Sequence, residues 1–260
     1  MKNLIKRLGE SSLNFFIYIG GAFHLFVGTL AQIFIPPFRR KELFVQMFKI
    51  GVMSLPIVFL VSLFTGMVLA LQSAYQLTKM NAQIYVSSLV ALSVVRELGP
   101  VLTALVIAGR VGASITAELG TMKVTEQIDA LETLAANPVK YLVVPRFIAL
   151  CVMLPLLTIY ADFIGIIGGY IIGVYKLLIG STVYLQLTYD SLVFKDIFTG
   201  LLKSFVFAII ICIVSCYEGF RAEGGAEGVG KATTFSVVTS FILIIAADCL
   251  FTALFYFVFP

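Results

Sequence analysis

Two residues of opposite charge stand side by side in a long apolar stretch of the sequence. Arg96 and Glu97 are the only charged residues within 84–108. An ionised side chain at the centre of a membrane helix costs about 2.5–3.5 kcal/mol on insertion scales, so it normally faces a partner or a wet cavity. Adjacent helix positions do not face each other. The two side chains therefore need separate partners, or one partner shared across a subunit interface.

Pro100 adds a backbone feature to the same stretch. Because proline has no N–H, it cannot donate to the carbonyl of Arg96 four residues earlier, and Gly99 loosens the same turn. The sequence predicts a kink that leaves a free carbonyl beside the two charges. Two interpretations stay open: a buried ion pair that fixes helix register, or a cavity where Arg96 meets an anionic headgroup. We favour the cavity.

Two further acids, Asp162 and Asp248, also lie in apolar stretches. Each can pair with a cation of another helix; the candidates are Arg96, Arg110 and Lys203. A proton relay through the two acids is the alternative, and it would make the chain a proton-coupled secondary transporter of lipids or small amphiphiles. We expect structural pairing. The sequence predicts no catalytic residues and no metal site.

The amino-acid composition of the chain is typical of a protein that is embedded in lipid. Of its 260 residues 60% are hydrophobic and only 12% are charged, about half the charged fraction of soluble domains. The sequence predicts an all-α membrane protein with five transmembrane helices, an N-terminal interfacial or re-entrant helix and a cytoplasmic coupling helix. The predicted spans are 52–71, 84–108, 147–175, 197–217 and 236–259, and the N-terminal helix is 13–35.

The distribution of basic residues predicts an orientation. Most of the 18 Lys and Arg residues fall on one side if the N-terminus is inside, as the positive-inside rule requires. The N-terminus and the segments 118–140 and 218–234 are then cytoplasmic, and the C-terminus lies outside. We expect a single integral-membrane domain over 1–260, with an N-terminal interfacial segment (1–42) and a five-span core (43–260).

A short polar segment between the second and third spans has the pattern of a surface helix. Thr125 can cap a helix whose first turn carries Glu126 and Asp129, and Pro138 ends it. An apolar stripe follows the same helix at three-residue spacing: Ile128, Leu131 and Leu134. The helix over 121–137 either rests on lipid headgroups or docks into a groove of another protein. We favour docking, because uphill transport needs energy and this chain has no nucleotide site.

One segment of the sequence is close to a nucleotide-binding motif. Residues 225–231 read GAEGVGK, close to a phosphate-binding loop, but Ala232 stands where the motif requires Ser or Thr. The motif also follows a membrane helix instead of a β-strand. We therefore expect a flexible cytoplasmic turn that presents three charged residues: Glu223, Glu227 and Lys231.

Several longer motifs resemble one known family. They read RELGPVLTALVIAGRVG, AELGTMKVTEQIDAL, NPVKYLVVPR and GGAEGVGKATTFSVVTS. On these motifs the chain resembles the MlaE (YrbE) family of ABC-transporter permeases over nearly its whole length. The resemblance implies a homodimeric, multi-pass protein of the bacterial inner membrane that moves phospholipid between inner and outer membranes to maintain lipid asymmetry. It also implies cytoplasmic ATPase subunits that hold ATP and Mg²⁺, a periplasmic ring of MCE domains, and no nucleic-acid partner.

The resemblance also assigns site residues by their motif positions. Lipid contact is expected from Arg96 and Glu97 and from an apolar lining: Leu69, Leu77 and Met80. Contact with the ATPase is expected in the coupling region, at Glu118, Thr125, Glu126, Gln127, Asp129 and Leu131. No cofactor is expected in this chain.

Overall fold

The computed structural model describes residues 2–33, 35–36 and 39–258, with the side chains of 13, 16–33, 35–36, 39–255 and 257. Throughout these residues the regular structure is helical. Its α-helices are α1 (Lys2–Ile33), α2 (Arg40–Ile50), α3 (Leu55–Thr78), α4 (Val86–Ser93), α5 (Gly99–Ile107), α6 (Ala113–Val124), α7 (Gln127–Thr133), α8 (Val144–Tyr175), α9 (Ser181–Ser191), α10 (Phe194–Phe220) and α11 (Gly225–Val258). Short 3₁₀ turns, η1 (Val52–Ser54) and η2 (Gln83–Tyr85), and π-helical turns, η3 (Val94–Leu98), η4 (Ala108–Gly112) and η5 (Val139–Val143), join several of them.

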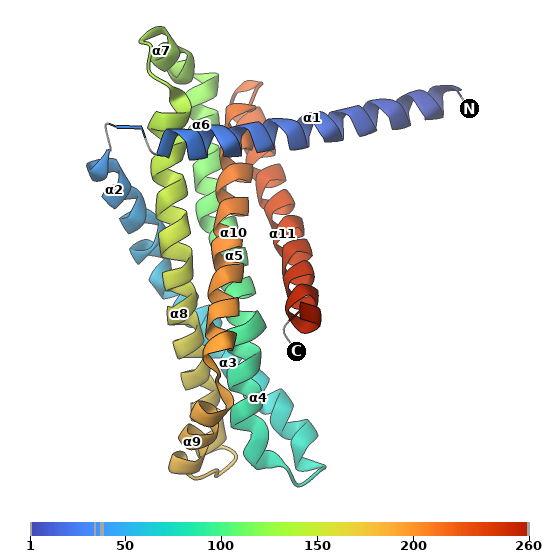
Figure 1. Cartoon of the computed structure of the whole chain (residues 1–260), viewed down its shortest axis with the longest axis vertical. Helices are drawn as coiled ribbons and strands as arrows, with labels where there is room; N and C mark the ends of the chain where they lie inside the picture. The colour runs from blue at the N-terminus through green and yellow to red at the C-terminus, as the bar shows by residue number, and fades with distance from the viewer. Residues whose placement is uncertain (1, 34, 37–38, 259–260) are drawn as a thin grey trace.

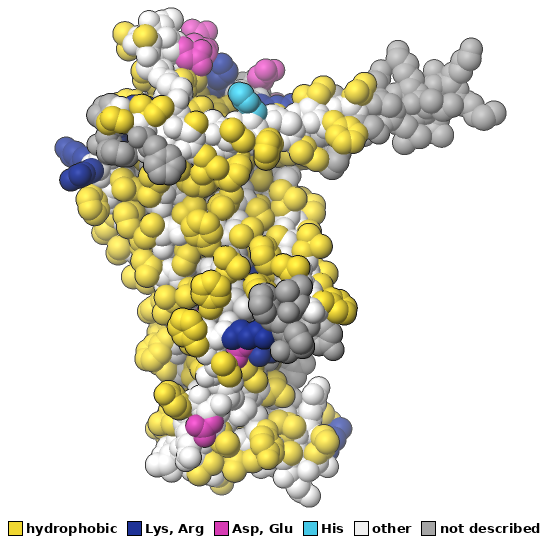
Figure 2. Space-filling view, viewed as in Figure 1, with side chains coloured by type: hydrophobic (Ala, Val, Ile, Leu, Met, Phe, Trp, Pro, Cys, Tyr) yellow, Lys and Arg dark blue, Asp and Glu magenta, His cyan; other side chains and the backbone are white. Residues whose placement is uncertain are grey.

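The fold class predicted from the sequence is confirmed. Six helical stretches of the described residues are long and apolar enough to cross a bilayer, and α1 is one of them. Figure 1 shows that α1 lies across the end of the bundle that carries α7, whereas α3, α8, α10 and α11 follow the long axis. This direction, in one uninterrupted helix, fits an interfacial segment better than a re-entrant one. Hydrophobic side chains cover the flank of the bundle in Figure 2, and charged ones gather near α7.

The predicted second span is part of a much longer rod. Helical turns continue without a break over Gln83–Val124, 42 residues, about 60 Å at 1.5 Å per residue and twice the hydrocarbon thickness. Arg96 therefore lies about 20 Å from one end of the rod and about 40 Å from the other. The helix thus continues well beyond the predicted span 84–108, because the residues after Ala108 extend it to Val124.

The coupling segment contains a turn within its predicted length. α6 continues to Val124, the backbone of Glu126 is left-handed (φ 60°), and α7 then occupies only Gln127–Thr133. Thr125 is not the N-cap as predicted. Glu126 stands at that position without a side-chain cap bond, and the Thr125 hydroxyl donates to the Thr121 carbonyl at 2.7 Å.

The predicted flexible turn over 218–234 is also corrected. α10 ends at Phe220 and α11 begins at Gly225, so GAEGVGK forms the first turns of α11. Only a short connection separates the helices, and two glycines with positive φ reverse the chain there: Gly224 (85°) and Gly225 (71°). The Lys231 ammonium lies 2.7 Å from the Glu227 carboxylate one turn away. Helical order suits this stretch because its Ala, Glu and Lys residues favour it.

Close backbone packing joins α3 to α8. A methyl group on Gly66 would collide with the Gly165 carbonyl oxygen, and one on Gly168 with the Leu63 carbonyl oxygen. Membrane helices approach this closely only through small residues, because lipid provides no hydrophobic drive for their association. The α3–α8 pair is therefore the rigid wall against which the rod packs.

Gly66→Ala should destabilise the protein by about 1–3 kcal/mol, the usual cost of overpacking. A lower thermal midpoint of the detergent-purified protein would show this. Gly230→Ala is the matched control, because nothing lies within 4 Å of a methyl group there. Equal midpoints for the two variants would mean that α3 and α8 are further apart than the structure has them.

Candidate functional site

The guanidinium of Arg96 pairs with a carboxylate of another helix. Its Nε donates to Asp196 Oδ1 at 2.7 Å, and Nη2 lies 2.6 Å from the same oxygen. The other oxygen, Asp196 Oδ2, accepts the backbone N–H of Val193 at 3.3 Å, so this carboxylate also caps α10. The Asp196 side chain is only 4% exposed, whereas that of Arg96 is 54% exposed. Arg96 is anchored at one edge and open at the other.

Glu97 has a different partner, as its helix position predicts. Lys203 on α10 places its ammonium 2.7 Å from Glu97 Oε2 and 2.9 Å from Asp248 Oδ1 on α11. The same ammonium donates to Thr252 Oγ1 at 2.8 Å, and this hydroxyl lies 3.1 Å from Glu97 Oε1. Lys203 is 2% exposed. Its single charge joins the rod, α10 and α11.

The Arg96 carbonyl, which Pro100 leaves without its helical donor, accepts a hydrogen bond from another helix. Lys203 Nζ lies 3.3 Å from the Arg96 carbonyl oxygen. The backbone there is a π-helical turn, η3, at the place where the sequence predicts a kink. Turns of this kind are frequent at functional sites. The disturbed backbone therefore helps to hold the lysine that neutralises Glu97.

Of the two predicted acids, only one is paired. Asp248 meets Lys203, as expected, whereas Asp162 Oδ1 on α8 is buried without a hydrogen-bond partner. That oxygen sits so close to Gly99 that a methyl group there would collide with it. Asp162 thus packs against the start of α5, and the expected pairing with Arg96, Arg110 or Lys203 is absent from the described contacts.

The predicted apolar lining falls into two environments. Leu69 and Leu77 are partly buried against a small core cluster between α3 and α4, and this cluster includes Val94 of η3. Met80, in the turn after α3, is strongly exposed. Leu69 and Leu77 therefore belong to the α3–α4 cluster that extends to Val94 of the rod, whereas Met80 lies beyond the end of the helix.

Sequence reasoning missed part of this cluster, which we call the charged hub: Arg96, Glu97, Asp196, Lys203, Asp248 and Thr252. Lys203, a predicted candidate partner of the two acids, is buried and also pairs with Glu97. Asp196 has no predicted role. The available signal was their spacing, because Asp196 and Lys203 are seven residues apart and therefore lie on one face of a helix.

The predicted coupling residues at the α7 end have mixed roles. Glu118 accepts a bond from Arg146 at 2.8 Å and lies 3.4 Å from Lys49, so it joins α6 to α8 and α2. Asp129 pairs with Lys123 at 2.7 Å across the turn before α7. The predicted stripe is divided between core and solvent: Ile128 is buried, Leu131 is half-buried and Leu134 is 78% exposed.

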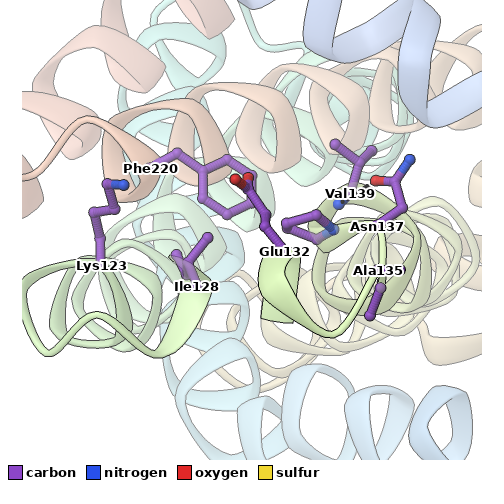
Figure 3. A pocket seen from close by; sticks show the side chains of 9 residues that line it. Lys123, Ile128, Glu132, Ala135, Asn137, Val139 and Phe220 are labelled. Carbon is purple, nitrogen blue, oxygen red and sulfur yellow. Dashed lines mark hydrogen bonds between the residues drawn. The ribbon is translucent and has the colours of Figure 1, made fainter. Parts of the chain in front are cut away.

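The remaining polar groups of this end are open to solvent. Glu126 and Gln127 are exposed, and Gln127 Nε2 donates to Thr125 Oγ1 at 3.0 Å. A groove of about 530 Å³ separates α7 from the end of α10, with Lys123, Glu132 and Phe220 on its walls. Figure 3 shows these side chains surrounding the open space. The α7 end thus offers charges, a groove and an exposed leucine together.

Comparison with known proteins gives consistent similarities. The sequence model of the family described as Permease MlaE matches residues 43–254. A probable ABC transporter permease of Rickettsia felis is 46% identical over 255 residues, covering 98% of both chains. One from Synechocystis is 43% identical over 210 residues, covering 81% of this chain and 80% of the relative. The intermembrane phospholipid transport system permease protein MlaE of Haemophilus influenzae is 38% identical over 256 residues, covering 97% of both chains.

Lys203→Met should destabilise the protein strongly, because it leaves Glu97 and Asp248 without their shared cation. Removing one member of a buried ion pair costs about 3–5 kcal/mol; Glu97 is partly exposed, so the lower figure applies. Adding Glu97→Gln and Asp248→Asn to Lys203→Met should recover much of the loss. Thermal melting of the single and triple variants measures both effects, and a triple variant no more stable than the single one would contradict this role of Lys203.

Proposed function

Because the chain belongs to the MlaE permease family, we propose that it is the membrane subunit of an ABC transporter that moves phospholipid between the inner and outer membranes of a bacterium. In this proposal it maintains lipid asymmetry as a homodimer in the inner membrane. Cytoplasmic ATPase subunits hydrolyse ATP, and a periplasmic ring of MCE domains exchanges lipid with it. The name of the Haemophilus relative supports phospholipid as the substrate class.

The half-exposed guanidinium of Arg96 is the observation that carries the proposal. Its buried edge is held by Asp196, so the open edge is already oriented when a ligand arrives. Guanidinium groups bind phosphate oxygens through paired N–H donors. Leu69 and Leu77 on α3 pack against the cluster that includes Val94 of the rod, and in this proposal they provide apolar surface for the acyl chains.

The rod supplies a path from ATP hydrolysis to this site. α7 follows directly on the rod's end at Val124, and Arg96 lies in the same rod about 40 Å away. An ATPase that closes on α7 would therefore shift the rod and α8, which pack together, and would reshape a cavity between two copies of the chain. This scheme places the N-terminus and α7 in the cytoplasm and the C-terminus in the periplasm, in agreement with the positive-inside rule.

Arg96→Gln should lower ATP-dependent lipid transfer by the reconstituted transporter by about tenfold or more, the usual effect of losing a charge-assisted phosphate contact. Dimer assembly should persist. The matched control is the double variant Arg96→Gln/Asp196→Asn, which removes the unpaired carboxylate left by the first change. Recovered stability with impaired transfer is the expected result.

Two results would contradict this role. Normal transfer by the double variant would mean that Arg96 serves only to neutralise Asp196. Transfer driven by a pH gradient without ATP, and abolished by Asp162→Asn, would support the proton-coupled alternative, for which the unpaired Asp162 is the relevant observation.

Charge reversal at Glu126 and Asp129 should weaken co-purification of the ATPase by about tenfold, because interfacial charges guide docking. The stability of the permease itself should change by less than about 1 kcal/mol, since the Lys123–Asp129 pair is largely exposed. Asp190→Lys, on α9 at the opposite end of the bundle, is the control.

A charge swap separates the two roles of Asp129. Lys123→Asp/Asp129→Lys keeps an ion pair across the turn but inverts the charges presented by α7. Full recovery of ATPase binding in the swapped variant would show that Asp129 serves only to hold Lys123, and the proposed contact would be lost.

A further inference from the structure

A cationic cavity lies between α2 and α6, away from the charged hub. It measures about 290 Å³, and its polar lining includes Lys49, Arg110 and Glu118. Arg110 is 14 positions after Arg96 in the same rod, about 21 Å along it. The cavity is therefore on the half of the bundle that carries α1 and α7, which the proposed orientation assigns to the cytoplasmic leaflet.

Two nitrogens of the Arg110 guanidinium have no hydrogen-bond acceptor among the described residues. Its Nη1 donates to the Ser54 hydroxyl at 2.6 Å and lies 3.4 Å from the Lys49 carbonyl oxygen. Among the described residues no carboxylate forms an ion pair with it. A guanidinium has five N–H donors, so its Nε and Nη2 groups remain for a ligand. A cation in this position needs an anion that the chain itself does not provide.

The neighbouring charges leave the cavity positive. Glu118 is shared between Arg146 at 2.8 Å and Lys49 at 3.4 Å. One carboxylate thus faces three cations when Arg110 is included. The Lys49 side chain is half exposed and its contact with Glu118 is long, so its ammonium can turn toward an arriving phosphate without breaking the Glu118–Arg146 pair.

An apolar groove opens directly beside the cavity. It measures about 550 Å³ and shares Lys49 and Met53 with the cavity. Its other walls include Phe44, 67% exposed, and Phe48, 56% exposed. Figure 2 shows Lys or Arg side chains over the start of α2, with hydrophobic side chains continuing below them.

We propose that this cavity and groove bind one anionic phospholipid of the cytoplasmic leaflet. The phosphate lies between Arg110 and Lys49, and the acyl chains run along Phe44 and Phe48. Basic pockets between membrane helices on the cytoplasmic side bind anionic headgroups by the same chemistry. A second copy of the chain would cover the aromatic groove but would bury Arg110 without an anion, so a lipid satisfies both parts better. The leaflet assignment rests on the proposed function; the binding does not.

A single tryptophan can report on the groove, because the chain has none of its own. Phe48→Trp places the reporter beside Lys49 in the full chain reconstituted into vesicles. Phosphatidylglycerol with brominated chains should quench its fluorescence at lower mole fraction than brominated phosphatidylethanolamine does. Arg110→Gln in the same background should reduce this preference about fivefold, and Lys49→Gln should reduce it by a similar factor. Arg110→Lys should retain most of it.

Three controls make the result specific to this cavity. A tryptophan at Phe163, which is 63% exposed on α8, should be quenched equally by both lipids. Ser54→Ala removes the hydroxyl that holds Arg110 but keeps the guanidinium, so it should reduce the preference by less than Arg110→Gln does. Arg96→Gln should also keep it, so loss of transport in that variant leaves this test intact.

Equal quenching of the Phe48 reporter by the two lipids would overturn the proposal. Weak quenching by both lipids would also overturn it, because the groove would then be covered by protein. An unchanged preference in the Arg110→Gln/Lys49→Gln double variant would show that neither cation binds the headgroup.

Discussion

A charge inside a bilayer has to be neutralised by another group of the protein, and the ammonium of Lys203 meets this requirement for three helices at once. It contacts Glu97 of the rod and Asp248 of α11 from its own position on α10. Because the Lys203 side chain is only 2% exposed, solvent does not easily replace its contacts. The relative positions of the rod, α10 and α11 depend on this one cation, and Arg96 is presented to its surroundings only because Glu97 is already satisfied.

The rod carries two arginines, each in a π-helical turn and each held from one side by a neighbouring helix. Arg96 in η3 is held by Asp196 of α10, and Arg110 in η4 is held by Ser54 next to α3. A π turn inserts one residue into the helix and changes the direction of the side chains that follow. Two such turns let one continuous helix present cations at two levels, 14 residues apart, while its apolar faces stay packed.

The fold class could be predicted because lipid imposes long apolar helices, and such stretches are visible in a sequence without any partner. The separate partners of Arg96 and Glu97, and the carbonyl freed by Pro100, could be predicted from local helix geometry. The identities of Asp196 and Thr252 as partners could not, because they approach from helices about 100 and 155 positions away. The extent of the rod was underestimated for a different reason. The predicted span ends at Ala108 because more polar residues follow it. A helix, however, continues as long as its backbone hydrogen bonds and packing do, and both extend past Ala108.

The length of the rod has a further consequence for the path of a lipid. A helix about 60 Å long in a hydrocarbon layer about 30 Å thick leaves a surplus of about 30 Å to be divided between the two aqueous sides. The protein is therefore taller than the membrane that holds it. In the proposed function, a lipid that moves along the rod leaves the plane of its leaflet while still touching protein, so extraction from the bilayer and exposure of its chains to water become separate steps.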